Sequence, residues 1–115
     1  MARTTLEVMQ DHLDRADNED VEGDLMANYA EDCVLLTSYG RFDGHDGIRA
    51  AAALLMEQVN GGKWHYLRLD VAGELAFLEW TGDGSNATVS DGADSFIVRD
   101  GKVRYMTAHY TVVPK

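Results

Sequence analysis

Two ionisable side chains fall at positions where the sequence otherwise predicts apolar faces. His12 borders the apolar stripe of a predicted helix that contains Met9 and Leu13, and Asp94 shares a predicted strand face with Phe96. Burying an ionisable group costs free energy unless it is paired or neutral, so such positions are typical of a polar spot in a ligand pocket. An imidazole acts as acid, base or hydrogen-bond donor near neutral pH, and a buried carboxyl that stays protonated donates to a carbonyl. His12 and Asp94 are therefore our candidate catalytic residues.

Each assignment has a structural alternative. His12 at a helix boundary can bond to backbone or water, and Asp94, just after Gly92, can pair with a cation or a turn amide. Glu79 is a third catalytic candidate, as a general base. Both faces of its predicted strand are partly apolar, so the pattern leaves open whether Glu79 faces the interior or solvent.

A further set of side chains is predicted to line a pocket around these groups. The same residue types also fill ordinary cores. The predicted lining residues are Tyr29, Thr37, Tyr39, Phe42, Met56, Trp64, Phe77, Phe96, Met106 and Tyr110.

The helices and strands that must position these residues are predicted from hydrophobic periodicity and from capping and turn residues. The segment Thr4-Thr5-Leu6-Glu7 predicts a capping box that opens a helix, and Asp20 and Asp46 predict the caps of two more. The second helix is expected to bury Tyr29 and Ala30. Short strands are predicted near 34–37 and 40–44, and four longer ones over 64–72, 75–82, 87–99 and 102–113, with a hairpin turn at 100–101. The 115 residues predict one α+β domain (1–115), a curved antiparallel sheet wrapped on three N-terminal helices as a cone-shaped barrel.

Three segments in this order resemble the nuclear transport factor 2-like superfamily. They are the run from Asp20 to Leu36, the run from Gly44 to Arg49, and the run from Asp94 to Val103. Among its members the chain is most similar to the SnoaL-like proteins and the ketosteroid isomerases. The resemblance implies a cone whose mouth holds a ligand.

The same resemblance implies particular roles for three positions. Asp94 matches the strand aspartate that binds the substrate oxyanion in the isomerases, and His12 stands where they have a first-helix tyrosine. The position of their proton-moving carboxylate falls at or next to Thr37, which cannot act as a base near neutral pH. By this resemblance Asp94 is retained, His12 replaces the tyrosine, and Thr37 stands at or next to the position of the base.

Composition narrows the classes of partner. The net charge of −10 repels phosphate backbones and anionic lipid surfaces, so neither nucleic acid nor membrane is expected as a partner. No histidine spacing typical of a metal site and no glycine-rich nucleotide loop occurs, so neither a metal nor a cofactor is expected. The N-terminal residues have no apolar signal core, which predicts a cytoplasmic protein.

Three functions remain open. The first is a cofactor-independent enzyme acting by acid–base chemistry on a small apolar carbonyl- or hydroxyl-bearing molecule, as an isomerase, cyclase, dehydratase or epoxide hydrolase does. The second is a non-catalytic ligand-binding module, which the loss of a base at Thr37 favours. The third is a dimerisation domain with a filled cone. We also expect a homodimer through the outer sheet face that carries Ile97, Thr107 and His109.

Overall fold

The computed structural model describes residues 2–115, which fold into three helices and seven strands. Within this range no helix is both long and apolar enough to cross a membrane. In chain order the elements are α1 (Thr5–Asp17), α2 (Val21–Asn28), β1 (Tyr29–Thr37), β2 (Gly40–Asp43), α3 (Gly44–Gln58), β3 (Lys63–Ala72), β4 (Leu75–Asp83), β5 (Ala87–Arg99), β6 (Lys102–His109) and β7 (Val113–Pro114).

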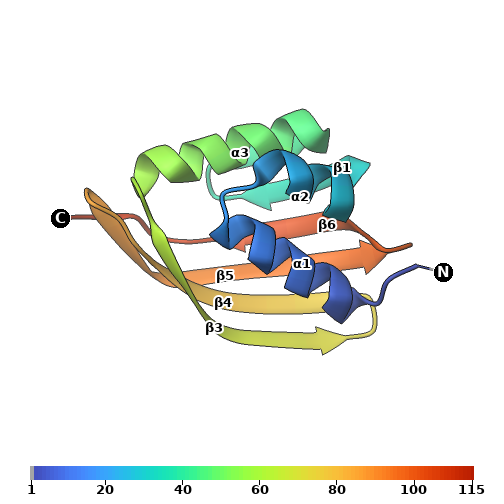
Figure 1. The fold of residues 1–115 in the computed structure, drawn as a ribbon. Helices are drawn as coiled ribbons and strands as arrows, with labels where there is room; N and C mark the ends of the chain where they lie inside the picture. The colour runs from blue at the N-terminus through green and yellow to red at the C-terminus, as the bar shows by residue number, and fades with distance from the viewer. Residues whose placement is uncertain (1) are drawn as a thin grey trace.

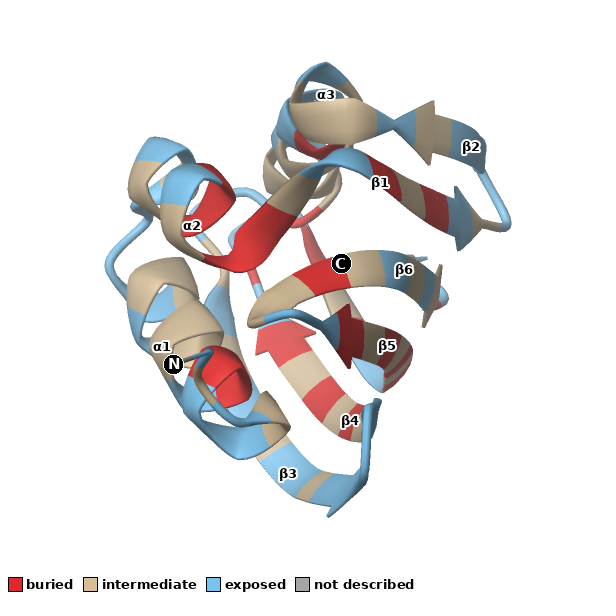
Figure 2. Cartoon of the chain, turned by 90° about the vertical axis from the view of Figure 1, so that its right-hand side faces the viewer, coloured by how far each residue is buried: buried red, intermediate tan, exposed pale blue. Residues whose placement is uncertain are grey.

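All strands belong to one curved sheet. Its order is β2-β1-β6-β5-β4-β3, with β7 paired to β5. Figure 1 and Figure 2 show α1, α2 and α3 together on one side of this sheet. The path ends at β2 and β3 without a ladder between them in residues 2–115, so the sheet is unclosed. The predicted α+β cone is confirmed, with one difference: β1 and β6 run parallel within a sheet that was expected to be antiparallel throughout.

The helix starts follow the predicted caps in two cases out of three. Thr4 and Glu7 form the capping box of α1, and the side chain of Asp20 accepts a hydrogen bond from the backbone of Gly23 in α2. The predicted cap at Asp46 is wrong, because α3 begins earlier, at Gly44. Asp46 lies in the first turn of α3, where its carboxylate pairs with Arg49. Its negative charge also interacts favourably with the positive end of the helix dipole.

The end of α2 also differs from the prediction. The helix ends at Asn28. Tyr29 and Ala30 therefore belong to β1, and not to the inner face of α2 as predicted. Tyr29 is a β-favouring residue that forms a register pair with Val103 of β6, so sheet pairing outweighs the continued helical spacing.

Alternation along β4 and β5 decides which side chains face the helices. Leu78 and Trp80 of β4 are buried, and so are Asp94 and Phe96 of β5, which lie on the same face. Glu79 therefore lies on the outer face, which is the second of the two orientations that the sequence left open.

Gly92 makes room for the indole of Trp80. The two residues are cross-strand partners, and a Cβ atom on Gly92 would lie 2.3 Å from Cδ2 of Trp80. A glycine at this inward position is therefore needed for the observed place of the indole, which in turn reaches Asp94.

We expect Gly92→Ala to lower the free energy of unfolding by about 1–3 kcal/mol, because a rigid indole cannot move aside without disturbing the core. Urea denaturation measures the change. Ser95→Ala, on the outer face of the same strand, is the matched control and should change it by less than about 0.5 kcal/mol. A Gly92→Ala protein as stable as the wild type would contradict this account of the packing.

Candidate functional site

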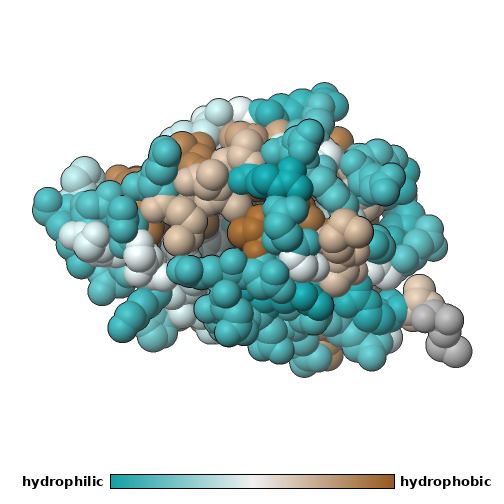
Figure 3. Space-filling view, turned by 45° about the horizontal axis from the view of Figure 1, so that its top comes forward, coloured by the Kyte–Doolittle hydropathy of each residue, from teal (hydrophilic) through white to brown (hydrophobic). Residues whose placement is uncertain are grey.

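A cavity of about 400 Å³ lies between the helices and the concave face of the sheet. This volume falls in the range of small-molecule sites. Its walls are mainly apolar, and Figure 3 shows apolar atoms gathered within a hydrophilic surround on the face seen from the α3 side. The predicted site residues that line the cavity are His12, Asp94, Tyr29, Thr37, Phe42, Met56, Trp64, Met106 and Tyr110.

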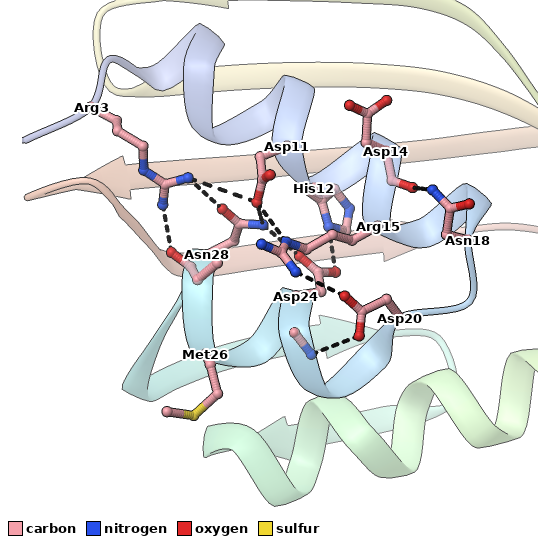
Figure 4. A network of polar contacts seen from close by, with 12 residues as sticks. Arg3, Asp11, His12, Asp14, Arg15, Asn18, Asp20, Asp24, Met26 and Asn28 are labelled. Atoms are coloured by element: carbon pink, nitrogen blue, oxygen red, sulfur yellow. Dashed lines mark hydrogen bonds and ion pairs between the residues drawn. The ribbon is translucent and has the colours of Figure 1, made fainter.

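The polar centre of the cavity is a hydrogen bond between two helices. Nδ1 of His12 on α1 lies 2.8 Å from Oδ2 of Asp24 on α2, and both side chains are only 12% exposed. Figure 4 shows the two side chains pointing toward one another between the helices. Our sequence analysis missed Asp24. A signal was present, since Asp24 and Asn28 share the inner stripe of α2 with Val21 and Leu25.

Asn28 fixes the carboxylate of Asp24. The fully buried Asn28 amide donates one hydrogen bond of 2.8 Å to Oδ1 of Asp24 and another of 2.8 Å to Oδ2 of Asp11. Its oxygen accepts a hydrogen bond of 2.9 Å from Arg3, as Figure 4 shows. Both N–H groups end on carboxylates, so the amide orientation is determined, and Asp24 is held toward His12.

The environment of His12 favours its protonated form. Burial by itself lowers the pKa of His12, but the hydrogen bond to Asp24 and the negative charges of Asp24 and Asp94 outweigh it, so the pKa lies above the ordinary 6.5. The imidazole packs edge-on against the rings of Tyr29 and Phe96, at centroid distances of 5.8 and 5.5 Å. These contacts fix the plane of the ring.

The second nitrogen of His12 is the one available to a ligand. In residues 2–115 no fully buried side-chain nitrogen or oxygen lacks a partner, and Nε2 has no bond to protein. Nε2 is therefore accessible, and His12 lines the cavity. A neutral imidazole would accept a proton there, and an imidazolium paired with Asp24 would donate one.

Asp94 presents a carboxyl group to the same cavity. Its Oδ1 accepts a hydrogen bond of 3.0 Å from Nε1 of Trp80, while Oδ2 has no protein partner among the described residues and so, by the same reasoning, is accessible. Burial raises the pKa of Asp94 to about 6, and the bond from Trp80 and the charge of His12 oppose the rise. The group can therefore change its protonation state close to neutral pH.

Thr37 lies in the same cross-strand row as Asp94, with Ala108 between them. Strands are spaced by about 4.8 Å, so two strand spacings separate the two residues. The hydroxyl of Thr37 bonds to the backbone of Tyr39 and Gly40 in the adjacent turn.

Four of the predicted site residues do not line the cavity. Glu79 lies 3.8 Å from Arg68 on the outer face, and Phe77 shares that face. Tyr39 is 45% exposed and packs on Tyr110 from outside. Phe96 is fully buried and supports the His12 ring rather than meeting a ligand.

The described residues offer no ready metal site. Among residues 2–115 no group of three histidine, cysteine, aspartate or glutamate side chains is arranged to hold an ion.

We expect Asp94→Asn to stabilise the protein near neutral pH. The pKa of Asp94 is about 6 in the folded state against an ordinary 3.8, so ionisation disfavours the folded state. The contribution of Asp94 to the free energy of unfolding is fully present below about pH 4 and is lost as the pH rises through 6. Above that pH the contribution is about 3 kcal/mol lower than below pH 4. Asparagine keeps an acceptor for Trp80 without the charge.

Urea denaturation across this pH range tests the expectation. The Asp94→Asn advantage should grow between pH 4 and pH 6, the interval set by the two pKa values. Asp100→Asn, at an exposed turn, should show no such growth. A pH-independent difference for Asp94→Asn would contradict the buried, pKa-shifted carboxyl.

Structural comparison shows the same fold in proteins of low sequence identity. A provisionally assigned ketosteroid isomerase from Kribbella flavida DSM 17836 aligns with TM-score 0.77 and 17% identity, over 93% of this chain and 77% of that one. A provisionally assigned polyketide cyclase from Sinorhizobium meliloti aligns with TM-score 0.72 and 18% identity, over 89% and 93%. A de novo designed protein with a curved β-sheet reaches TM-score 0.78 at 15% identity, over 96% and 88%. A shared fold does not by itself specify an activity.

Sequence comparison identifies the family. The comparison with curated proteins found no match. Residues 9–106 match the SnoaL-like domain, a range that begins within α1, ends within β6 and includes His12, Asp24 and Asp94. The chain therefore belongs to the SnoaL-like domain family of the nuclear transport factor 2-like superfamily.

Proposed function

We propose that this protein binds a small, largely apolar carbonyl- or hydroxyl-bearing molecule in the cavity and moves a proton on it. The observation that carries the proposal is the buried hydrogen bond of 2.8 Å between His12 and Asp24, with the other imidazole nitrogen accessible from an apolar cavity. A histidine held by a carboxylate is the arrangement that general acid–base catalysis uses repeatedly.

In this proposal His12 is the catalytic residue that takes and returns the proton at Nε2. Asp24 is a positioning residue: it orients the ring through Nδ1 and stabilises the imidazolium that forms. Asp94 is the second group that touches the ligand. Glu79, our other candidate base, lies on the outer face, so the proton-moving role falls to His12.

The reaction class is isomerisation, cyclisation or dehydration, with epoxide opening as a further possibility of the same chemistry. Each needs one group that moves a proton and one that holds an oxygen or an adjacent polar group, without a cofactor. The provisional assignments of the two structural relatives as isomerase and cyclase agree with this class.

The alternative is a non-catalytic ligand-binding module. Thr37 favours it, because a hydroxyl bonded to its own turn stands where the resemblance places a carboxylate base. A binder would use the same cavity without proton transfer, so the two functions differ in whether the ligand exchanges a proton.

Deuterium exchange into a ketone distinguishes these functions. With β-tetralone in D₂O, followed by proton NMR, we expect wild type to accelerate loss of the α-proton signal above the buffer rate. His12→Gln should slow this by at least about 100-fold, the usual contribution of a general acid–base group. Asp24→Asn should slow it less and move the pH–rate profile to lower pH, because it removes the negative charge of Asp24, which raises the pKa of His12.

His65→Gln is the matched control, since His65 is an exposed histidine on β3, and it should keep the full rate. Wild type that binds the ketone without accelerating exchange would establish the binding module instead. Full exchange by His12→Gln would remove His12 from the catalytic role.

We also propose that the outer sheet face binds a second copy of this chain. One cross-strand row on that face contains Val34, Tyr105, Ile97 and Leu75, and Tyr105 and Leu75 are 49% and 46% exposed. All three helices lie on the other side of the sheet, so no element among residues 2–115 covers this row. An uncovered apolar sheet face favours association.

Sedimentation at micromolar concentration should give about twice the chain mass of 12.7 kDa. Tyr105→Asp should yield the single-chain mass, because it places charge in the centre of the interface. Met26→Asp, at a 70% exposed apolar residue on α2, should leave the mass doubled. A wild-type mass of one chain would refute the homodimer.

A further inference from the structure

The charged side chains around the cavity are unbalanced in sign. His12 is the only basic side chain that lines it within residues 2–115, against Glu19, Asp20, Asp24 and Asp94. His12 and Asp24 neutralise one another through their hydrogen bond. One deep carboxyl, that of Asp94, is left without a dedicated cation.

Asp94 is also incompletely bonded. It is 8% exposed, and one of its oxygens accepts a single hydrogen bond from Trp80, while the other has no protein partner among the described residues. A buried carboxylate is costly unless it is paired, and polar groups this deep in a protein usually have their bonds satisfied. An accessible oxygen on a buried acid is therefore a place for a ligand group that brings a positive charge.

Aromatic rings line the cavity beside the carboxyl group of Asp94. The indole edge of Trp80 meets Asp94, and the Trp80 ring packs on Trp64 at 5.6 Å and 82° and on Tyr110 at 5.6 Å and 51°. All three rings line the cavity. Rings at such steep angles form corners, and the face of an aromatic ring attracts a cation.

From this arrangement we infer that the ligand carries a cationic nitrogen, which pairs with Asp94 beside the rings of Trp80, Trp64 and Tyr110. This rests on the proposal that the cavity is the ligand site, and it narrows the substrate class to amine-bearing carbonyl or hydroxyl compounds.

The other charge states of a ligand fit the cavity less well. A neutral ligand leaves the charge of Asp94 uncompensated, and an anion adds a second negative charge to a buried acid. Glu19 and Asp20 line the cavity where α1 passes into α2, and although Asp20 pairs with Arg15, Glu19 adds a further negative charge there. The net charge of −10 on the whole chain acts in the same direction.

The two tryptophans of the chain report on the site directly, because Trp64 and Trp80 both line the cavity. Their fluorescence can be titrated with three phenols of nearly the same shape and different charge. These are para-hydroxyphenyl trimethylammonium, which is cationic, para-tert-butylphenol, which is neutral, and para-phenolsulfonate, which is anionic. Near neutral pH, wild type should bind the cation at least about tenfold more tightly than the neutral phenol, and the anion most weakly.

Asp94→Asn tests whether Asp94 causes the preference. The ratio of cation to neutral affinity should fall to about one, while the neutral phenol still binds. Asp100→Asn removes the same formal charge from an exposed turn and should keep the wild-type ratio. Both variants are conservative in shape, and Asp94→Asn removes a buried charge, so loss of the fold does not explain a change in ratio.

Each other outcome has a distinct meaning. If the neutral phenol binds wild type as tightly as the cation, the cation inference is overturned while the ligand site stands. If the preference survives in Asp94→Asn, the role of Asp94 is overturned. If none of the three phenols changes the fluorescence, both the inference and the proposed ligand site fall.

Discussion

The structure depends on how a few ionisable groups are held inside an apolar cone. His12 and Asp24 meet at 2.8 Å between two helices, and neither would be tolerated there alone, because an unpaired buried charge costs several kcal/mol. The hydrogen bond therefore holds α1 against α2 and sets the direction of the imidazole at the same time. Asn28 extends the arrangement by donating a hydrogen bond to the remaining oxygen of Asp24.

Asp94 differs from this pair because its carboxyl group is only partly hydrogen-bonded. Its carboxyl is nearly as deep, yet it receives one hydrogen bond, from Trp80, and burial raises its pKa more than that bond and the charge of His12 lower it. A protein selected for stability alone would place an apolar residue there, between Gly92 and Phe96 on a buried strand face. Groups that lower stability in this way are retained where they serve a ligand or a reaction. The function we propose rests on this contrast: Asp24 has hydrogen bonds to both of its oxygens, whereas Asp94, in the same cavity, has a protein partner for only one.

Much of the fold could be predicted from the sequence because periodicity and caps act locally. The capping box at Thr4 and the alternation of Phe96 and Val98 are local signals, and the structure contains both features. The parallel pairing of β1 with β6 joins segments about seventy residues apart, and no local pattern encodes it. Tyr29 was misplaced on a helix for the same reason, since its pairing with Val103 is a long-range contact.

The site was predictable only where a polar residue interrupts an obvious apolar pattern. His12 and Asp94 interrupt long, clear patterns. Asp24 and Asn28 lie on an eight-residue helix that also contains Gly23 and has only a weak apolar stripe, so their inward direction was hidden. The orientation of Glu79 was undetermined because Phe77 and Leu78 make both faces of β4 look suitable for a core.

Arg3 connects the hydrogen-bond network of His12, Asp24 and Asn28 to residues outside the cavity. Its guanidinium bonds to Asn28, to the carbonyl of Ala27 at the end of α2 and to the carbonyl of Gly101 in the turn between β5 and β6. Two segments that are remote in the chain, the end of α2 and the β5–β6 turn, are thereby tied to one side chain, which is two hydrogen bonds away from Asp24. A disturbance at that hairpin would reach the imidazole as a change in the orientation of the Asn28 amide rather than as a change in charge.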